Sequence, residues 1–123
     1  MFQKMLQGGS GGGASSFQFS TEEQKTNIKW LDGKPLYTKT IITDVAINGA
    51  NVSINHNIPN VDKIFIDSAF LNKTDGSSYV LPYVTTKHTS VFANRTQLTF
   101  ASNDSWPTTY EKAITVIYTK TTD

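Results

Sequence analysis

Seven stretches between residues 35 and 120 place apolar side chains at alternate positions or in short runs, each bounded by turn-forming residues. Successive side chains of a β-strand point to opposite faces, so a repeat of two predicts a strand with one buried face. In the last stretch Ile114, Val116 and Tyr118 share one predicted face, and Thr115 and Thr119 share the other. The predicted strands are residues 35–47, 51–56, 61–71, 78–84, 89–94, 96–102 and 112–120.

Short strands with one buried face each predict antiparallel sheets that pack on one another. The composition agrees, because 17 Thr, 11 Ser and 9 Asn occur in a chain of which 17% is charged. Thr suits a half-exposed pleated surface, and Asn and Ser favour turns. The pair Asp75-Gly76 predicts a hairpin turn, since glycine accepts a positive φ. The sequence therefore predicts an all-β fold, an antiparallel, jelly-roll-like β-sandwich of about seven or eight strands.

Size and charge limit the function classes. At 123 residues the chain fits one domain whose core needs neither metal nor disulfide. It has no cysteine, which excludes disulfides, thiolate zinc sites and cysteine nucleophiles. Basic and acidic residues balance at 11 and 10, without a basic cluster, so nucleic acid is not an expected partner. No apolar run reaches bilayer length, and we expect no membrane insertion.

The N-terminal region differs in composition from the rest of the chain. Phe2, Met5 and Leu6 would share one face of a helical turn, which suggests that residues 1–7 form a docking peptide. Residues 8–16 form a Gly/Ser run typical of a flexible tether, and residues 17–123 form the predicted domain. The alternative is a terminus without a partner, or an engineered linker. Between the tether and residue 35 we predict at most a short turn, at a Ser-x-x-Glu capping box.

No residue cluster indicates an enzyme. Catalysis needs a nucleophile with a base, paired carboxylates or metal ligands that converge on a pocket. His56 and His88 lie far apart in the sequence without other ligands at metal-binding spacing, so we expect each to make local hydrogen bonds. The sequence predicts no catalytic residue, no metal and no cofactor.

Aromatic residues in the loops suggest a binding surface instead. Trp106 lies in a Pro-containing stretch close to Asn103 and Asp104, and Tyr83 follows Leu81-Pro82. A flat apolar ring with nearby side-chain oxygens is what a saccharide site needs, so these four residues form a possible saccharide-binding site. The alternative is that Trp106 covers one end of the sandwich, because large aromatic side chains usually serve burial.

Three segments, TEEQ…WLDGKPLYTKTI, NHNIPNVDKIFID and YTKTTD, resemble a small domain of structural proteins of tailed bacteriophages and their prophages. The resemblance covers residues 19–123 and is weakest in the middle segment. By this likeness the two copies of YTKT, residues 37–40 and 118–121, are not a repeat. They belong to the first and last long strands of one domain, and we expect them to lie near one another in the sheet.

The resemblance implies a virion protein without enzymatic activity, a C-terminal type of module in tail, baseplate or head-fibre components that often assembles as a trimer. No fibre shaft separates the N-terminal peptide from the domain. The chain therefore fits a head-fibre or decoration protein on the virion surface, assembled in the bacterial cytoplasm. Phe2, Met5 and Leu6 would dock on capsid, neck or baseplate proteins. The alternative is a tail or baseplate module that binds a host-surface glycan through Trp106 and its neighbours.

Overall fold

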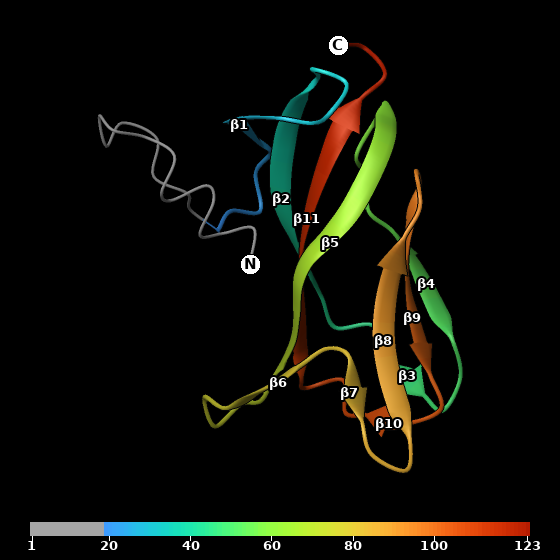
Figure 1. Ribbon diagram of the computed structural model, residues 1–123. Coiled ribbons are helices and arrows are strands. Elements are labelled where there is room, and N and C mark those ends of the chain that lie inside the picture. Colours follow the sequence, from blue (N-terminus) through green and yellow to red (C-terminus); the bar gives the residue numbers. More distant parts are fainter. Residues whose placement is uncertain (1–18) are drawn as a thin grey trace.

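The computed structural model describes residues 19–123, which contain β-strands and no helix. The docking peptide 1–7 and the tether 8–16 lie outside the described residues, so nothing tests them here. Figure 1 shows the strands in two facing layers. Their bounds are β1 (Gln24–Lys29), β2 (Pro35–Thr43), β3 (Ile47–Asn48), β4 (Val52–Asn55), β5 (Val61–Asn72), β6 (Ser78–Val80), β7 (Tyr83–Val84), β8 (His88–Ala93), β9 (Gln97–Ser102), β10 (Ser105–Trp106) and β11 (Glu111–Lys120).

The sheets confirm the predicted all-β, sandwich-like class. One layer is a five-stranded sheet in the order β1-β2-β11-β5-β6, and the other is a four-stranded sheet in the order β4-β9-β8-β7. A small sheet of β10 and β3 lies near one end. Every described strand pair is antiparallel. The turn before β6 contains Gly76 at φ 91°, as the Asp-Gly hairpin requires.

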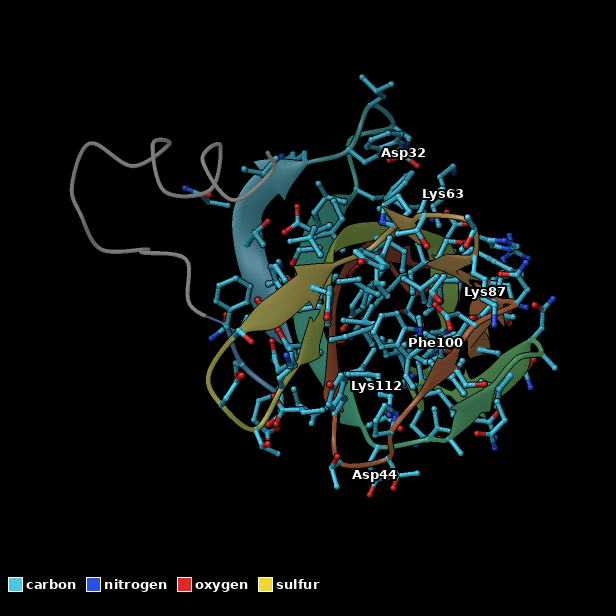
Figure 2. All side chains as sticks on the ribbon, turned by 90° about the horizontal axis from the view of Figure 1, so that it is seen from below. Asp32, Asp44, Lys63, Lys87, Phe100 and Lys112 are labelled. Carbon is cyan, nitrogen blue, oxygen red and sulfur yellow. The ribbon has the colours of Figure 1, made fainter. Side chains whose placement is uncertain are left out.

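The core lies between the two layers. Leu98 and Phe100 of β9 are fully buried, as are Ile114, Val116 and Tyr118 of β11. Phe100 lies at the centre of the molecule in Figure 2. Burial of each such apolar side chain stabilises the fold by about 1.5–3 kcal/mol. The alternation read from the sequence therefore identified the residues that hold the layers together.

The expectation that the last strand has one exposed face is wrong. Thr115 and Thr119 are 2% and 0% exposed, so β11 is buried on both faces. β11 is the central strand of its sheet, between β2 and β5. The hydroxyls of Thr115 and Thr40 are 2.9 Å apart in a hydrogen bond, and the Thr119 hydroxyl accepts the backbone N–H of Lys63. Hydrogen bonds thus let threonine occupy a buried strand position.

Strand number and boundaries also differ from the prediction. The sequence predicted no strand at β1. Its residues QKTNIK are almost all polar, so they show no apolar repeat of two, and in this edge strand half-buried side chains alternate with exposed ones. β10 lies in the Pro-containing stretch for which no strand was predicted; it ends just before Pro107 and belongs to a sheet of only two strands. The predicted strand 78–84 is divided into β6 and β7 at Leu81-Pro82, since proline cannot donate to a ladder.

The two copies of YTKT lie on neighbouring strands, as expected. Tyr37 of β2 is directly opposite Tyr118 of β11, and their rings stack with centroids 5.8 Å apart. The Tyr118 hydroxyl donates to Glu23 Oε1 over 2.5 Å, and Lys120 Nζ donates to Glu23 Oε2 over 2.6 Å. Burial and the bond to Glu23 raise the pKa of Tyr118 far above its usual value. The repeated letters therefore form one contact within one domain.

Candidate functional site

Four aromatic residues meet at the end of the molecule where β6, β7 and β10 lie (Figure 1). Tyr79 is 4.8 Å from Tyr83 and 5.1 Å from Trp106 between ring centroids. Trp106 is also 5.7 Å from Tyr83 and 6.2 Å from Tyr110. We call these four half-buried residues the aromatic cluster. The structure thus brings together Trp106 and Tyr83, two members of the predicted saccharide site, and adds two further rings.

Short strands hold the aromatic cluster in place. Tyr79 pairs with the fully buried Leu71, and Trp106 pairs with the fully buried Ile47. The Trp106 indole N–H donates to the Thr89 hydroxyl over 2.8 Å. Thr89 is fully buried, so this bond fixes the indole from inside the fold. Trp106 therefore also covers one end of the core, as in the alternative to saccharide binding that the sequence analysis gave.

Asn103 and Asp104 mainly shape the loop before Trp106. Asn103 Oδ1 accepts the backbone N–H of His88 over 2.8 Å, and Asp104 Oδ1 accepts that of Ser105 over 2.8 Å. The Asp104 carbonyl also accepts the backbone N–H of Gly49. Within residues 19–123, Asn103 Nδ2 and Asp104 Oδ2 make no hydrogen bond. Each side chain thus keeps one polar atom for a ligand.

The rim of the aromatic cluster offers further polar groups. The hydroxyls of Tyr79, Tyr83 and Tyr110 make no hydrogen bond to another residue of the described range 19–123. Lys73 Nζ lies 5.8 Å from the centroid of the Tyr79 ring, at cation–π distance. The sequence analysis did not identify Tyr110, although it follows Trp106 at a spacing of four. Rings with unbonded hydroxyls can stack on a sugar and bind its hydroxyl groups.

Lys112 anchors the loop that carries Tyr110. It is fully buried on β11, and its Nζ donates to the Pro107 carbonyl over 3.3 Å. Loss of hydration lowers the pKa of Lys112, partly offset by the field of Asp44. Figure 2 shows both labelled side chains. A buried ammonium group with one carbonyl acceptor positions the loop but costs desolvation energy.

The opposite end of the sandwich is closed by ion pairs. Asp62, at the start of β5, contacts Lys34 Nζ at 3.0 Å, Lys63 Nζ at 3.5 Å and an Arg95 guanidinium nitrogen at 3.4 Å. The hydrogen bond from Lys34 is the main reason why the pKa of Asp62 is lowered. Lys63 also lies 3.8 Å from Asp32, which Figure 2 shows beside it. We call this group the ionic end.

The two histidines lie in separate local settings. The buried His56 places Nε2 2.9 Å from the Asn94 carbonyl, and its Nδ1 accepts the Ile58 N–H over 3.1 Å. Both ring nitrogens thus make local hydrogen bonds, as expected from the sequence. His88 is exposed and bonds to Asn103 through its backbone. Among residues 19–123 no group of three or more His, Cys, Asp or Glu side chains could hold a metal.

Comparisons with known proteins add no relative. No family model, no curated protein and no solved structure matches the chain.

No helix within the described range could span a membrane. The docking residues Phe2, Met5 and Leu6 lie outside the described residues.

Proposed function

We propose that the chain is a structural protein of a tailed-phage virion, a head-fibre or decoration-type projection anchored by its N-terminal peptide. The observation that supports this best is that the three segments that resemble the phage domain meet in space. Trp30 of the first segment packs on Phe65 of the second, with ring centroids 4.7 Å apart. Lys34 of the first bonds both to Asp62 of the second and to the Lys120 carbonyl of the third.

Such contacts favour one structural unit over a chance similarity of short motifs. The three segments lie on or next to the neighbouring strands β2, β11 and β5 of one sheet, as parts of one domain would. The Lys34–Asp62 ion pair and the stacked pair Tyr37–Tyr118 are both built from these segments. The described residues also lack a metal-binding group, and the two histidines lie in separate local settings.

The anchor would extend from the side of the five-stranded sheet. The Ser20 carbonyl accepts the Thr40 N–H over 2.7 Å, which fixes the point where the N-terminal segment joins the domain. A Gly/Ser tether such as residues 8–16 spans roughly 16 Å on average. In this proposal Phe2, Met5 and Leu6 dock on a capsid, neck or baseplate protein, and the domains project, with the trimer as the expected assembly.

Cosedimentation with phage particles tests the anchor. The full-length protein is added to particles made in a host that lacks this gene. A variant with Phe2→Ser, Met5→Ser and Leu6→Ser should lose attachment, because it removes the apolar contacts, whereas Gln3→Ser with Gln7→Ser should keep it. Unchanged circular dichroism would show that the domain remains folded. Equal cosedimentation of both variants would contradict the proposal.

Light scattering on the full-length protein at several concentrations tests the assembly. A mass of three chains at all concentrations supports a projecting trimer. A monomer at all concentrations would contradict the trimer and favour a decoration protein that is held singly by its N-terminal peptide.

The aromatic cluster favours a second candidate, a module that binds host-surface saccharide. Because Trp106 is packed into the fold, Trp106→Ala would confuse lost binding with lost stability. Tyr110→Ala and Tyr83→Phe are better variants, since both rings are half-exposed and their hydroxyls make no bond within residues 19–123. Both should weaken binding to host cells, and Phe92→Ala, on an exposed side chain of β8, should not. Unchanged binding of the tyrosine variants would reject this function.

A further inference from the structure

A cavity of about 540 Å³ lies at the ionic end, between the loop that joins β4 to β5 and the turn that joins β8 to β9. Figure 1 shows both connections at the end of the sandwich where β5 begins. The cavity is shallow and open to solvent on one side, and its volume is within the range of small-ligand sites. We call it the loop cavity, and it is lined by Asn55, Asn57, Ile58, Pro59, Arg95 and Thr96.

Hydrogen bonds inside the fold hold both walls of the loop cavity in position. The buried His56 places Nε2 2.9 Å from the Asn94 carbonyl, and its Nδ1 accepts the Ile58 N–H. The backbone N–H of His56 donates to the Thr96 carbonyl. Asn94 Oδ1 accepts the backbone N–H groups of Thr96 and Gln97. Walls that are fixed before a ligand arrives lower the entropy cost of binding it.

The loop between β4 and β5 presents free amide groups. Asn57 and Asn60 have φ angles of 59° and 60° on either side of Ile58-Pro59, a left-handed backbone that asparagine accepts more readily than most residues. The exposed side-chain amide of Asn57 makes no hydrogen bond within residues 19–123. Asn55 uses only its side-chain oxygen in that range, so its Nδ2 is also free. The loop cavity thus combines two amides with the exposed ring of Pro59.

Arg95 is the charged residue in the lining of the loop cavity. Its Nε donates to the Asp62 carbonyl over 3.0 Å, and its Nη2 lies 3.4 Å from Asp62 Oδ1, so one edge of the guanidinium group faces Asp62. The side chain is 70% exposed, and Nη1 makes no hydrogen bond to another residue of the described range. The end formed by Nη1 and Nη2 is therefore open for a bidentate contact, which a carboxylate provides.

The charges of the ionic end favour an added anion. Lys34, Lys63 and Arg95 share only the carboxylates of Asp32 and Asp62, so one positive charge remains uncompensated in this group. Lys34 is closer to Asp62 than Arg95 is, at 3.0 Å against 3.4 Å, and Asp62 therefore keeps a cation when Arg95 contacts a ligand. The described residues that line the loop cavity carry no carboxylate. A ligand carboxylate beside Arg95 thus enters a positive field.

We propose that the loop cavity binds a uronic acid residue of a saccharide. The carboxylate contacts Arg95, hydroxyl groups bond to the amides of Asn55 and Asn57, and the apolar face of the sugar ring lies against Pro59. Amides suit hydroxyl groups because they both donate and accept. A neutral sugar leaves Arg95 unused, and a simple carboxylate leaves both amides unused. The inference does not rest on particle docking or on the aromatic cluster, which lies at the opposite end of the sandwich.

NMR titrations of the isotopically labelled full-length protein test the ligand class. The probes are the methyl glycosides of glucuronic acid and of glucose, which differ in the carboxylate, and acetate, which has the carboxylate alone. We expect the glucuronoside to shift the amide signals of Asn57 and Thr96 and the Nε–H signal of Arg95, and to leave those of Tyr79 and Tyr110 unchanged. The glucoside and acetate should bind about tenfold more weakly, because each lacks one set of contacts.

Three results would overturn the proposal. The first is no shift at the loop cavity with millimolar glucuronoside, or a shift at the aromatic cluster instead. The second is equal affinity for the glucoside, which would leave the carboxylate without a role. The third is equal affinity for acetate, which would show a general anion contact and no saccharide site.

Two matched pairs of variants test the residues. Arg95→Gln should weaken glucuronoside binding about tenfold, whereas Lys63→Gln, which removes the same charge outside the lining, should weaken it less. Asn57→Gly keeps the left-handed backbone and removes the amide, so binding should weaken about threefold. Asn60→Gly makes the same change at a residue outside the lining and should leave binding unchanged. Circular dichroism would check the fold of each variant, and equal effects within both pairs would overturn the proposal.

Discussion

The two ends of the sandwich are closed by different chemistry. At the ionic end, Asp62 links Lys34, Lys63 and Arg95, which come from three separate parts of the chain. At the other end, three rings of the aromatic cluster, those of Tyr79, Tyr83 and Trp106, pack on the core, with one internal hydrogen bond from Trp106. Ion pairs that remain accessible to solvent contribute little and are weakened by salt and acid, whereas half-buried rings packed on a core contribute more and are insensitive to both. The aromatic end should therefore carry more of the stability.

The largest expected effect is at the aromatic end. Trp106→Ala removes three ring contacts and leaves the buried Thr89 hydroxyl without its indole donor. We expect a loss of about 3 kcal/mol in the free energy of unfolding, measured with urea. Tyr110→Ala, at the margin of the cluster, should cost less. A smaller loss for Trp106→Ala than for Asp62→Asn would reverse the proposed order of the two ends.

The next effect concerns the polar contact next to the ionic end. Tyr118→Phe keeps the stacked ring but removes the buried hydroxyl that donates to Glu23. Because this hydrogen bond has a charged acceptor, we expect its removal to lower the free energy of unfolding by about 1.5 kcal/mol. Tyr110→Phe is the matched control, because the Tyr110 hydroxyl makes no bond within residues 19–123. Equal stabilities for both variants would show that the bond to Glu23 contributes nothing.

A substitution of Lys112 should keep or raise the stability of the fold, whereas the preceding substitutions should lower it. Lys112→Met keeps most of the side-chain volume and removes a buried charge that has one carbonyl acceptor. We expect no loss, or a gain of about 1 kcal/mol in unfolding free energy, because desolvation of the ammonium group disappears. Calorimetry would measure the change. A large loss would show that the bond to Pro107 holds the aromatic end together.

The smallest effect is the response to acid of the ionic end and of the neighbouring Glu23. Burial raises the pKa of Glu23, but the hydrogen bonds from Lys120 and Tyr118 outweigh it and leave the pKa below its ordinary value of 4.5. The pKa of Asp62 is also lowered. A carboxyl with a lowered pKa in the folded state stabilises the fold above its ordinary pKa, and this stabilisation is lost as the pH falls.

Urea unfolding between pH 7 and pH 3 measures this response. Stability should fall on the acid side, and Glu23→Gln with Asp62→Asn should make the curve flatter. Variants at the aromatic end should leave the shape of the curve unchanged. A curve of unchanged shape in the double variant would show that these two carboxyls do not stabilise the fold.

The core could be predicted from the sequence better than the sites. Alternation identified Ile114, Val116 and Tyr118, because burial between layers imposes a repeat of two. It missed β1, whose edge position leaves no apolar pattern, and it could not show that β11 is covered on both sides. Those properties depend on strand order, which only long-range pairing defines.

Only part of the candidate site could be predicted from the sequence, because its contacts also depend on long-range pairing. Trp106 and Tyr83 attracted attention because they lie outside the alternating pattern, and they do meet. The sequence could not show that the indole N–H and one oxygen each of Asn103 and Asp104 are used inside the fold. The bonds of Trp106 and Asn103 join residues that are distant in the sequence. Tyr110 could have been found from its spacing of four after Trp106, but not its contact with the ring.

Mass spectrometry of purified phage particles, from a host that carries this gene, tests the central claim most directly. The account predicts that the chain is present in the particles at a fixed ratio to the capsid protein. It also predicts that the variant with Phe2→Ser, Met5→Ser and Leu6→Ser is absent from them while remaining folded in the lysate. A wild-type chain that is found in the lysate and never in the particles would contradict the account.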